Sequence, residues 1–398
     1  MKNIGAAAIV LGLACSAAAA AGDPNVMRRG TLENSRMSFQ TRKQGHVAFL
    51  GGSITEMEGY RPMVCEMLRK RFPDANFTFT SAGISSTCST TGAFRLKEDV
   101  LDKGPVDLLF IDFAVNDDQD AHHTRGECIR GMEGIVRRLR RHNPRADIVL
   151  VYFVNEHMMA LYRKGETPLP IAAHEEVAAA YQLSSINLAK AVTARIDAGE
   201  FTWKTFGGVH PAPFGNRLAT DMVGQLMDEC WKGALPPGAA AKDYPMLAKP
   251  LDEANFGAGR FLDIKEAKVS EDWQVHVPAW AHLPGSKRDR FTKLPILETA
   301  KPGASLKIDF TGTAIGAYVL AGPDAGLVEA GIDGGPFRKV DLWHEFSAGL
   351  HYPRTVMFAD TLAPGKHTLA LKISADKNER SKGTAMRVMH FVVNDASP

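Results

Sequence analysis

The chain has 398 residues, of which 45% are hydrophobic and 23% are charged, and its formal net charge is +2. These fractions are ordinary for a globular protein, and the length exceeds that of one typical core, so we expect two domains. The small net charge argues against a dedicated nucleic-acid binder. The densest basic run, Arg137 to Arg141, lies between apolar positions of one predicted helix, and we expect it to be a solvated face.

The first 21 residues have the layout of a secretory signal peptide. Lys2 precedes an apolar stretch from Ile4 to Leu13, and the alanines from Ala17 to Ala21 offer an A-x-A cleavage site. Cys15 raises a lipoprotein alternative, but Gly12 stands where a lipobox usually has leucine. No later stretch is long and apolar enough to span a bilayer. We therefore expect an exported protein, periplasmic or extracellular, without a membrane span.

Residues 22–45 form an N-terminal segment, and in residues 46–232 apolar strand-like runs alternate with amphipathic helices. The predicted strands are 47–50, 77–79, 108–115, 148–154 and 186–188, and the predicted helices are 60–72, 129–139, 175–183 and 214–230. Alternating strands and helices indicate a parallel sheet between two layers of helices. In such sheets, sites form beyond the carboxyl ends of the strands.

The character of the sequence changes after residue 232. The segment 233–260 begins with GALPPGAAAK, which is typical of a linker, and residues 261–398 contain period-two runs separated by turn sequences such as GPDAG and DGG. We therefore expect a second, all-β domain, a sandwich of the jelly-roll kind.

The stretch HVAFLGGSIT, residues 46–55, places a serine at the end of the first strand. Gly51 and Gly52 leave room at the sheet edge, so Ser53 can present its hydroxyl and its own N–H to a substrate. A serine after glycine is also commonly an ordinary loop or cap residue. The α/β-hydrolase elbow G-x-S-x-G is not matched, because Thr55 replaces its final glycine. As a nucleophile, Ser53 therefore needs partners elsewhere.

Three further motifs follow Ser53. Gly83 lies in SAGISS after the second predicted strand, Asn116 lies in FAVNDD after the third, and His210 lies in GGVHPAPFGN before the last helix. Together the four blocks resemble those of the SGNH, or GDSL-type, hydrolases. The resemblance covers about residues 46–231 and implies a flavodoxin-like αβα sandwich with esterase chemistry.

The resemblance also implies a role for each of these residues. Ser53 would be the nucleophile, and His210 would be the base that takes its proton. The backbone N–H groups of Ser53 and Gly83, with the side-chain amide of Asn116, would form the oxyanion hole.

Two positions depart from the family pattern. Gly52 replaces the Asp of G-D-S, and Gly207 replaces the Asp of D-x-x-H, which orients the histidine. A backbone carbonyl near Gly207 would give a Ser–His dyad, whereas another acid would give an atypical triad. Glu56 and Asp117 lie near the blocks and are candidates for that acid. A third reading is an impaired or non-hydrolytic protein.

A secreted esterase of this fold with an appended β-sandwich resembles the carbohydrate acetylesterases. The resemblance implies removal of O-acetyl groups from an acetylated polysaccharide or oligosaccharide, such as xylan or another plant cell-wall glycan. Tyr60, Arg61 and Trp203 are candidates to bind the sugar or acyl group, although Trp203 fits core packing equally well. The alternatives are a lipase or thioesterase for longer acyl esters, against which the polar segment 157–173 argues, and a catalytically impaired carbohydrate-binding protein.

Cysteine and histidine spacing gives no recognisable metal motif. The four cysteines after the signal peptide allow three disulfide pairings, and buried thiols are an equally good reading; they are Cys65, Cys88, Cys128 and Cys230. His122 and His123 lie near three aspartates, but no H-E-x-x-H motif is present. Because the family resembled needs no metal, we expect neither a metal nor a cofactor.

Overall fold

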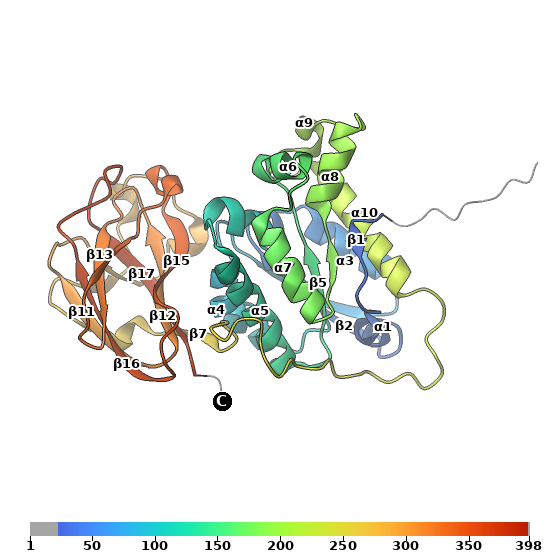
Figure 1. Cartoon of the computed structure of the whole chain (residues 1–398), viewed down its shortest axis with the longest axis horizontal. Helices are drawn as coiled ribbons and strands as arrows, with labels where there is room; N and C mark the ends of the chain where they lie inside the picture. The colour runs from blue at the N-terminus through green and yellow to red at the C-terminus, as the bar shows by residue number, and fades with distance from the viewer. Residues whose placement is uncertain (1–22, 397–398) are drawn as a thin grey trace, which may run out of the picture.

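The structure is a computed structural model, and it describes residues 23–396. The predicted signal peptide, residues 1–21, lies outside the described residues. Figure 1 shows two domains next to each other along the long axis of the molecule: a sheet between helices, and a domain built almost entirely of strands.

The first domain is organised around a six-stranded sheet with the order β1-β6-β5-β4-β2-β3. In that order, the strands are Val26–Met27, Ser184–Ile186, Asp147–Val151, Leu108–Asp112, Gln44–Gly51 and Asn76–Gly83. The neighbours from β6 to β3 are parallel, whereas β1 pairs antiparallel with β6. Apart from β1, this is the 2-1-3-4-5 order of flavodoxin-like folds, which confirms the predicted fold. Residues 26–40, which were predicted to lie outside this domain, supply its edge strand and a helix.

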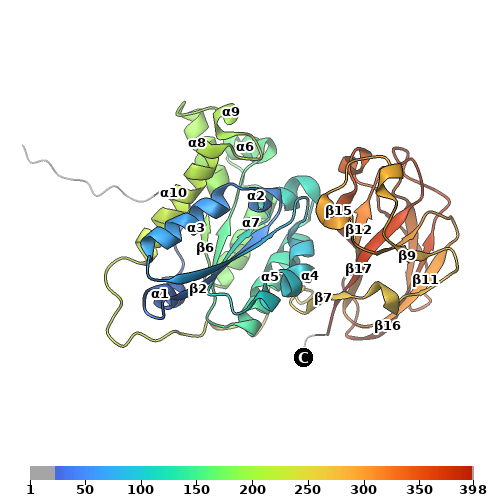
Figure 2. The same ribbon diagram turned by 180° about the vertical axis from the view of Figure 1, so that it is seen from behind.

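Helices cover both faces of this sheet. Figures 1 and 2 show α4, α5 and α7 on one face, and α1, α3 and α10 on the other. Their bounds are Ser89–Asp99, Arg125–His142, Leu169–Ala180, Glu33–Gln40, Tyr60–Arg71 and Pro213–Cys230; α6 (Glu156–Arg163), α8 (Leu188–Asp197) and α9 (Trp203–Phe206) complete the domain. All residues of β4 and β5 are buried, as the sequence predicted for strands covered on both faces.

The basic run on α5 is not the solvated face that the sequence suggested. Arg137 and Arg140 are buried, and their guanidinium groups donate to the carbonyl oxygens of Leu247 and Pro245 at 3.1 Å each. Arg141 donates to the carbonyl oxygen of Gly257 at 2.8 Å. These side chains hold the linker against α5 because its backbone carbonyls need hydrogen-bond donors once they are shielded from water.

The second domain is a sandwich of two antiparallel sheets, as predicted. One sheet has the order β15-β12-β17-β10-β9, with β7 also paired to β17; these strands are Tyr352–Ala359, Ala314–Ala321, Met386–Asn394, Ile296–Thr299, Gln274–His276 and Gly259–Leu262. The other sheet is β14-β13-β16-β11-β8, with bounds Arg338–Asp341, Leu327–Ile332, Gly365–Ile373, Ser305–Gly312 and Lys268–Val269. Burial alternates strictly along β11, so every second side chain enters the core between the sheets.

Two other expectations can be compared with the described residues. All four cysteines are free and buried. Within residues 23–396, no helix is both long enough and apolar enough to cross a membrane.

Candidate active site

Three neighbouring strands bring the predicted blocks to one edge of the first sheet. Strand β2 lies between β3 and β4, and its last residue, Gly51, is in register with Gly83 on one side and Asp112 on the other. The short helix α2 (Ser53–Glu56) follows β2, and the π-helical turn η2 (Asn116–Asp120) follows β4. Because parallel strands end at the same edge, segments that are distant in sequence become neighbours here.

The nucleophile and base predicted from the sequence are in contact. Ser53 is the first residue of α2, and the first N–H groups of a helix have no partner within it. The Oγ of Ser53 lies 2.8 Å from Nε2 of His210, which is on the loop between α9 and α10. His210 is exposed and Ser53 is half-buried, so a substrate can reach both. Desolvation lowers the pKa of His210, which favours the neutral imidazole that a general base needs.

Neither of the acids predicted to orient His210 reaches it. Glu56 accepts from the backbone N–H of Ser85 at 2.8 Å, and Asp117 lies against two other histidines, His123 and His174. Among the described residues, the side-chain hydrogen bond of His210 is the one to Ser53. The arrangement is therefore a Ser–His pair without a carboxylate partner.

The backbone explains why Gly207 replaces the family aspartate. Gly207 has a φ of +110°, and a Cβ placed on it would lie 1.9 Å from the backbone nitrogen of Ala212. That nitrogen donates to the carbonyl oxygen of Phe206 at 2.8 Å, which closes the loop that carries His210. A residue with a side chain would be strained and would clash with this loop.

The other departure, Gly52, also has a steric cause. A Cβ at Gly52 would lie 2.0 Å from Oδ1 of Asn116, so the amide packs directly on this glycine. Nδ2 of Asn116 donates to Oδ2 of Asp120 at 2.5 Å, which leaves the second N–H of the amide for a ligand. A Cβ at Gly83 would lie 2.3 Å from the backbone nitrogen of Glu56, so Gly83 packs equally closely against α2. The three predicted oxyanion residues, Ser53, Gly83 and Asn116, thus lie together at the carboxyl edge of the first sheet.

We expect Asn116→Ala to lower kcat by about 10² to 10³, with a small change in KM, because one donor to the developing oxyanion is lost. Steady-state kinetics on a short acetyl ester measures this effect. Asp118→Ala, in the same π-helical turn, is the matched control, since Asp118 bonds to Asn155 instead. If both variants keep the wild-type kcat, Asn116 has no part in the oxyanion hole.

Two arginines of the second domain hold the segment that follows β3. Arg290 donates from Nη1 to Oε1 of Glu56 at 2.5 Å and to the carbonyl oxygen of Gly83 at 3.1 Å. Arg288 donates to the carbonyl oxygen of Ser85 at 3.1 Å and to the hydroxyl of Ser86 at 2.8 Å. These contacts cross the domain boundary and fix the backbone on which the Gly83 N–H depends.

A third contact from the second domain reaches the segment that carries Asn116. His344 lies with its Nε2 2.7 Å from the carbonyl oxygen of Asp120, so Nε2 carries the proton and donates. Burial raises the pKa of Asp120 to about 6. Sequence reasoning missed these residues, because no local pattern connects the second domain to the loops of the first.

We expect Arg290→Ala to lower kcat by about 10- to 100-fold while KM changes little, because the Gly83 segment would lose its anchor and the oxyanion donor would shift. Arg130→Ala is the matched control. Arg130 also bridges the domains, to Asp360 at 2.7 Å, but it does not contact the Gly83 segment. Equal losses in both variants would mean that domain docking in general, and not this contact, supports activity.

The three predicted substrate-binding residues have different surroundings. Tyr60 is fully buried, and its hydroxyl lies 3.1 Å from Oγ1 of Thr55, so Tyr60 is a core residue and that prediction is wrong. Arg61 donates to the carbonyl oxygen of Thr55 at 3.1 Å, close to the nucleophile. Trp203 is partly exposed and stacks on Phe206, on the helix before the His210 loop. Roles for Arg61 and Trp203 in binding remain predictions.

Comparison with known proteins gives one similar family and several similar solved structures. Residues 49–218 match the model of the GDSL-like Lipase/Acylhydrolase family. A search of curated protein sequences gives no match. Two solved structures of a two-domain esterase (CEX) active on acetylated mannans share the fold of both domains. The one co-crystallized with mannopentaose is 20% identical over 94% of this chain and 97% of that chain, with a TM-score of 0.73. The other is 20% identical over 94% of this chain and 98% of that chain, with a TM-score of 0.74.

The family match covers the segments that carry Ser53, Gly83, Asn116 and His210, and the fold match extends through the second domain. Residues 49–218 of the first domain are therefore similar to the GDSL-like Lipase/Acylhydrolase family, and with the sandwich that follows they form a two-domain fold already known from an esterase.

Proposed function

We propose that this protein is a serine esterase that removes O-acetyl groups from an acetylated polysaccharide. The observation that carries the proposal is the 2.8 Å contact between Ser53 and His210 at the sheet edge, where Asn116 and Gly83 also lie. A nucleophile, a base and a set of neutral oxyanion donors are the groups that acyl transfer requires.

In the proposed reaction, His210 removes the proton of Ser53 as Oγ attacks the acetyl carbonyl. The N–H groups of Ser53, Gly83 and Asn116 receive the negative charge that develops on the carbonyl oxygen. The sugar hydroxyl leaves with the proton from His210, and an acetyl-enzyme remains. Water, activated by His210, then attacks the acetyl-enzyme, which releases acetate and restores Ser53.

The surroundings of Ser53 support a polar substrate with a short acyl group. Charged side chains lie close to the nucleophile helix: Arg61 pairs with Glu58, and Arg290 pairs with Glu56. His210 is exposed, which suits a polymeric substrate because a long chain can bind only at a site that is open to solvent. A lipase for long acyl chains would need a continuous apolar groove instead.

The choice of glycan rests on the structural relative of both domains. The structural relative of both domains acts on acetylated mannans and was crystallized with mannopentaose, so acetylated mannan joins acetylated xylan as the first substrate to test. The predicted signal peptide supports action outside the cytoplasm, where such polymers are found.

Acetate release from acetylated mannan, acetylated xylan and nitrophenyl esters of short and long acids tests the proposal. We expect release from at least one glycan and from the short esters, and none with Ser53→Ala. Glycan binding that persists in both proteins without any turnover would favour the carbohydrate-binding alternative. Preference for long acyl esters would favour a lipase or thioesterase.

A further inference from the structure

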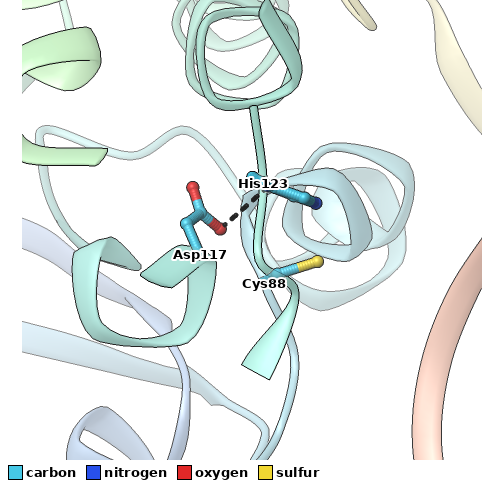
Figure 3. Close-up of side chains that lie close together, drawn as sticks. All are labelled: Cys88, Asp117 and His123. Atoms are coloured by element: carbon cyan, nitrogen blue, oxygen red, sulfur yellow. Dashed lines mark ion pairs between the residues drawn. The ribbon is translucent and has the colours of Figure 1, made fainter. Parts of the chain in front are cut away.

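A buried cluster of cysteine, histidine and aspartate side chains lies behind Asn116 and takes no part in the proposed reaction. Asp117 is the next residue of η2, Cys88 immediately precedes α4, and His123 precedes α5. Figure 3 shows these three side chains close together on three separate segments, with a dashed line between Asp117 and His123. Their ligand atoms all lie within 4.8 Å of one another.

The spacing between Asp117 and His123 fits two ligands of one metal ion. Oδ1 of Asp117 lies 3.4 Å from Nδ1 of His123, which is long for a hydrogen bond, and the buried Nδ1 has no hydrogen-bond partner among the described residues. Nitrogen and oxygen ligands about 2.0 to 2.1 Å from a tetrahedral zinc lie about 3.4 Å apart. A thiolate ligand would lie about 3.6 Å from them. Sγ of Cys88 lies within 4.8 Å of both ligand atoms, so a small side-chain movement brings it to this distance.

The groups around the cluster hold the ligands in place. Oδ2 of Asp117 lies 3.0 Å from Nε2 of His174, and Oδ1 accepts from the backbone N–H of Ser89 at 2.8 Å. Nε2 of His123 lies 3.4 Å from Oγ1 of Thr90, which is long for a hydrogen bond, so the firm partners in the cluster are those of Asp117. Partners of this kind orient metal ligands and are part of most metal sites.

The cluster can be reached from a cavity between the domains. Cys88 and His123 line this cavity, whose volume is about 240 Å³, and Tyr352 and Arg354 face them from the second domain. The cavity has room for a water molecule as a further ligand. A second group, Asp117 with Cys128 and His174, shares the same carboxylate but is completely buried.

We propose that Cys88, Asp117 and His123 bind one zinc ion, with a water molecule of the cavity as the fourth ligand. A thiolate, an imidazole and a carboxylate suit zinc better than magnesium or calcium. On binding, the Cys88 thiol loses its proton to solvent, and the thiolate and carboxylate balance the two charges of the metal. The ion joins η2 to the ends of α4 and α5, and so holds the turn that begins with Asn116. The sequence predicted no metal because the ligands form no spacing motif.

The test uses the full chain, purified without chelators, as the wild type, Cys88→Ala, Cys128→Ala and Cys230→Ala. Zinc bound per chain is measured by elemental analysis of the purified protein. Zinc affinity is then measured by titration of protein stripped with EDTA. We expect one zinc per chain in the wild type and in the two control variants. The dissociation constant of Cys88→Ala should be at least about 100-fold higher, because a direct ligand is lost. Circular dichroism establishes that each variant is folded.

Cobalt substitution of the wild type gives an independent readout. We expect thiolate-to-cobalt charge-transfer absorption and the protection of one thiol from alkylation, so the proposal does not depend on whether Cys88→Ala folds. The proposal is overturned if the wild type binds no zinc or shows no thiolate absorption. It is also overturned if Cys128→Ala, and not Cys88→Ala, loses the metal. A disulfide between Cys88 and Cys128, seen as two missing thiols, would overturn it as well.

Discussion

Ser53→Ala and His210→Ala should each lower kcat by about 10⁴ or more, and the double variant should be no slower than either single variant. The two side chains lie 2.8 Å apart and act as one unit, because the hydroxyl is a poor nucleophile until the imidazole accepts its proton. Activity on a short acetyl ester and acetate release from the preferred glycan both measure this effect. KM should change much less than kcat, since neither residue is expected to hold the sugar.

His157→Ala is the matched control for this pair. His157 is also an exposed histidine, but its Nδ1 lies 3.1 Å from Oδ2 of Asp118 and it makes no contact with Ser53. Its variant should retain nearly full activity. If the losses of Ser53→Ala and His210→Ala instead multiply in the double variant, the two residues act separately and the proposed proton transfer is wrong.

Gly207→Asp, which restores the family aspartate, should impair the protein. We expect the free energy of unfolding to fall by about 2 to 4 kcal/mol, because the new Cβ would be both strained at positive φ and in collision with the chain. The collision is with the backbone nitrogen of Ala212, 1.9 Å from that Cβ. We also expect kcat to fall by about 100-fold, since the loop that presents His210 would move. Urea unfolding and steady-state kinetics measure the two effects.

Gly208→Asp separates strain from collision. Gly208 also has a positive φ, of +80°, but no atom lies within 4 Å of a Cβ built there. It should therefore lose about 1 kcal/mol of stability from backbone strain and keep most of its activity. If Gly207→Asp is more active than the wild type, the loop accepts an acid beside His210, and the Ser–His pair is an incomplete triad.

Within residues 23–396 no carboxylate contacts His210, so the proposed mechanism works without an orienting acid. In a complete triad the carboxylate orients the imidazole, and its loss costs about 10⁴ in rate. Here two contacts hold the backbone of the loop that carries His210. The Ala212 N–H donates to the carbonyl oxygen of Phe206, and the Phe206 ring stacks on Trp203. A rigid loop can replace part of the orienting role of a carboxylate, although it cannot stabilise the imidazolium by charge.

The second domain has a structural part in the candidate site. Arg288, Arg290 and His344 all contact the segments that carry the predicted oxyanion residues Gly83 and Asn116, and their hydrogen bonds do not include His210. In the proposed mechanism, the sandwich therefore supports the oxyanion side of the site, while the first domain alone presents the base.

Local patterns in the sequence were enough to predict the fold and the strand edge at which Ser53, Gly83 and Asn116 lie. An apolar run that ends in glycines predicts a buried strand with an open end, and such runs alternating with amphipathic helices predict a parallel sheet. Because parallel strands all end at one edge, the order of strands and motifs along the chain is enough to place Ser53, Gly83 and Asn116 together. The period-two pattern of residues such as 305–312 likewise predicted the sandwich.

The tertiary structure decided what depends on contacts between distant segments. Arg137 and Arg140 look solvated in sequence but are buried, because the linker returns over α5 and offers them its carbonyl groups. Tyr60 is near the nucleophile in sequence but points into the core. The clash at Gly207 and the anchoring by Arg290 depend on how loops pass one another. Periodicity and turn signals describe neighbours along the chain, whereas these contacts depend on helix packing and domain docking, which no local pattern records.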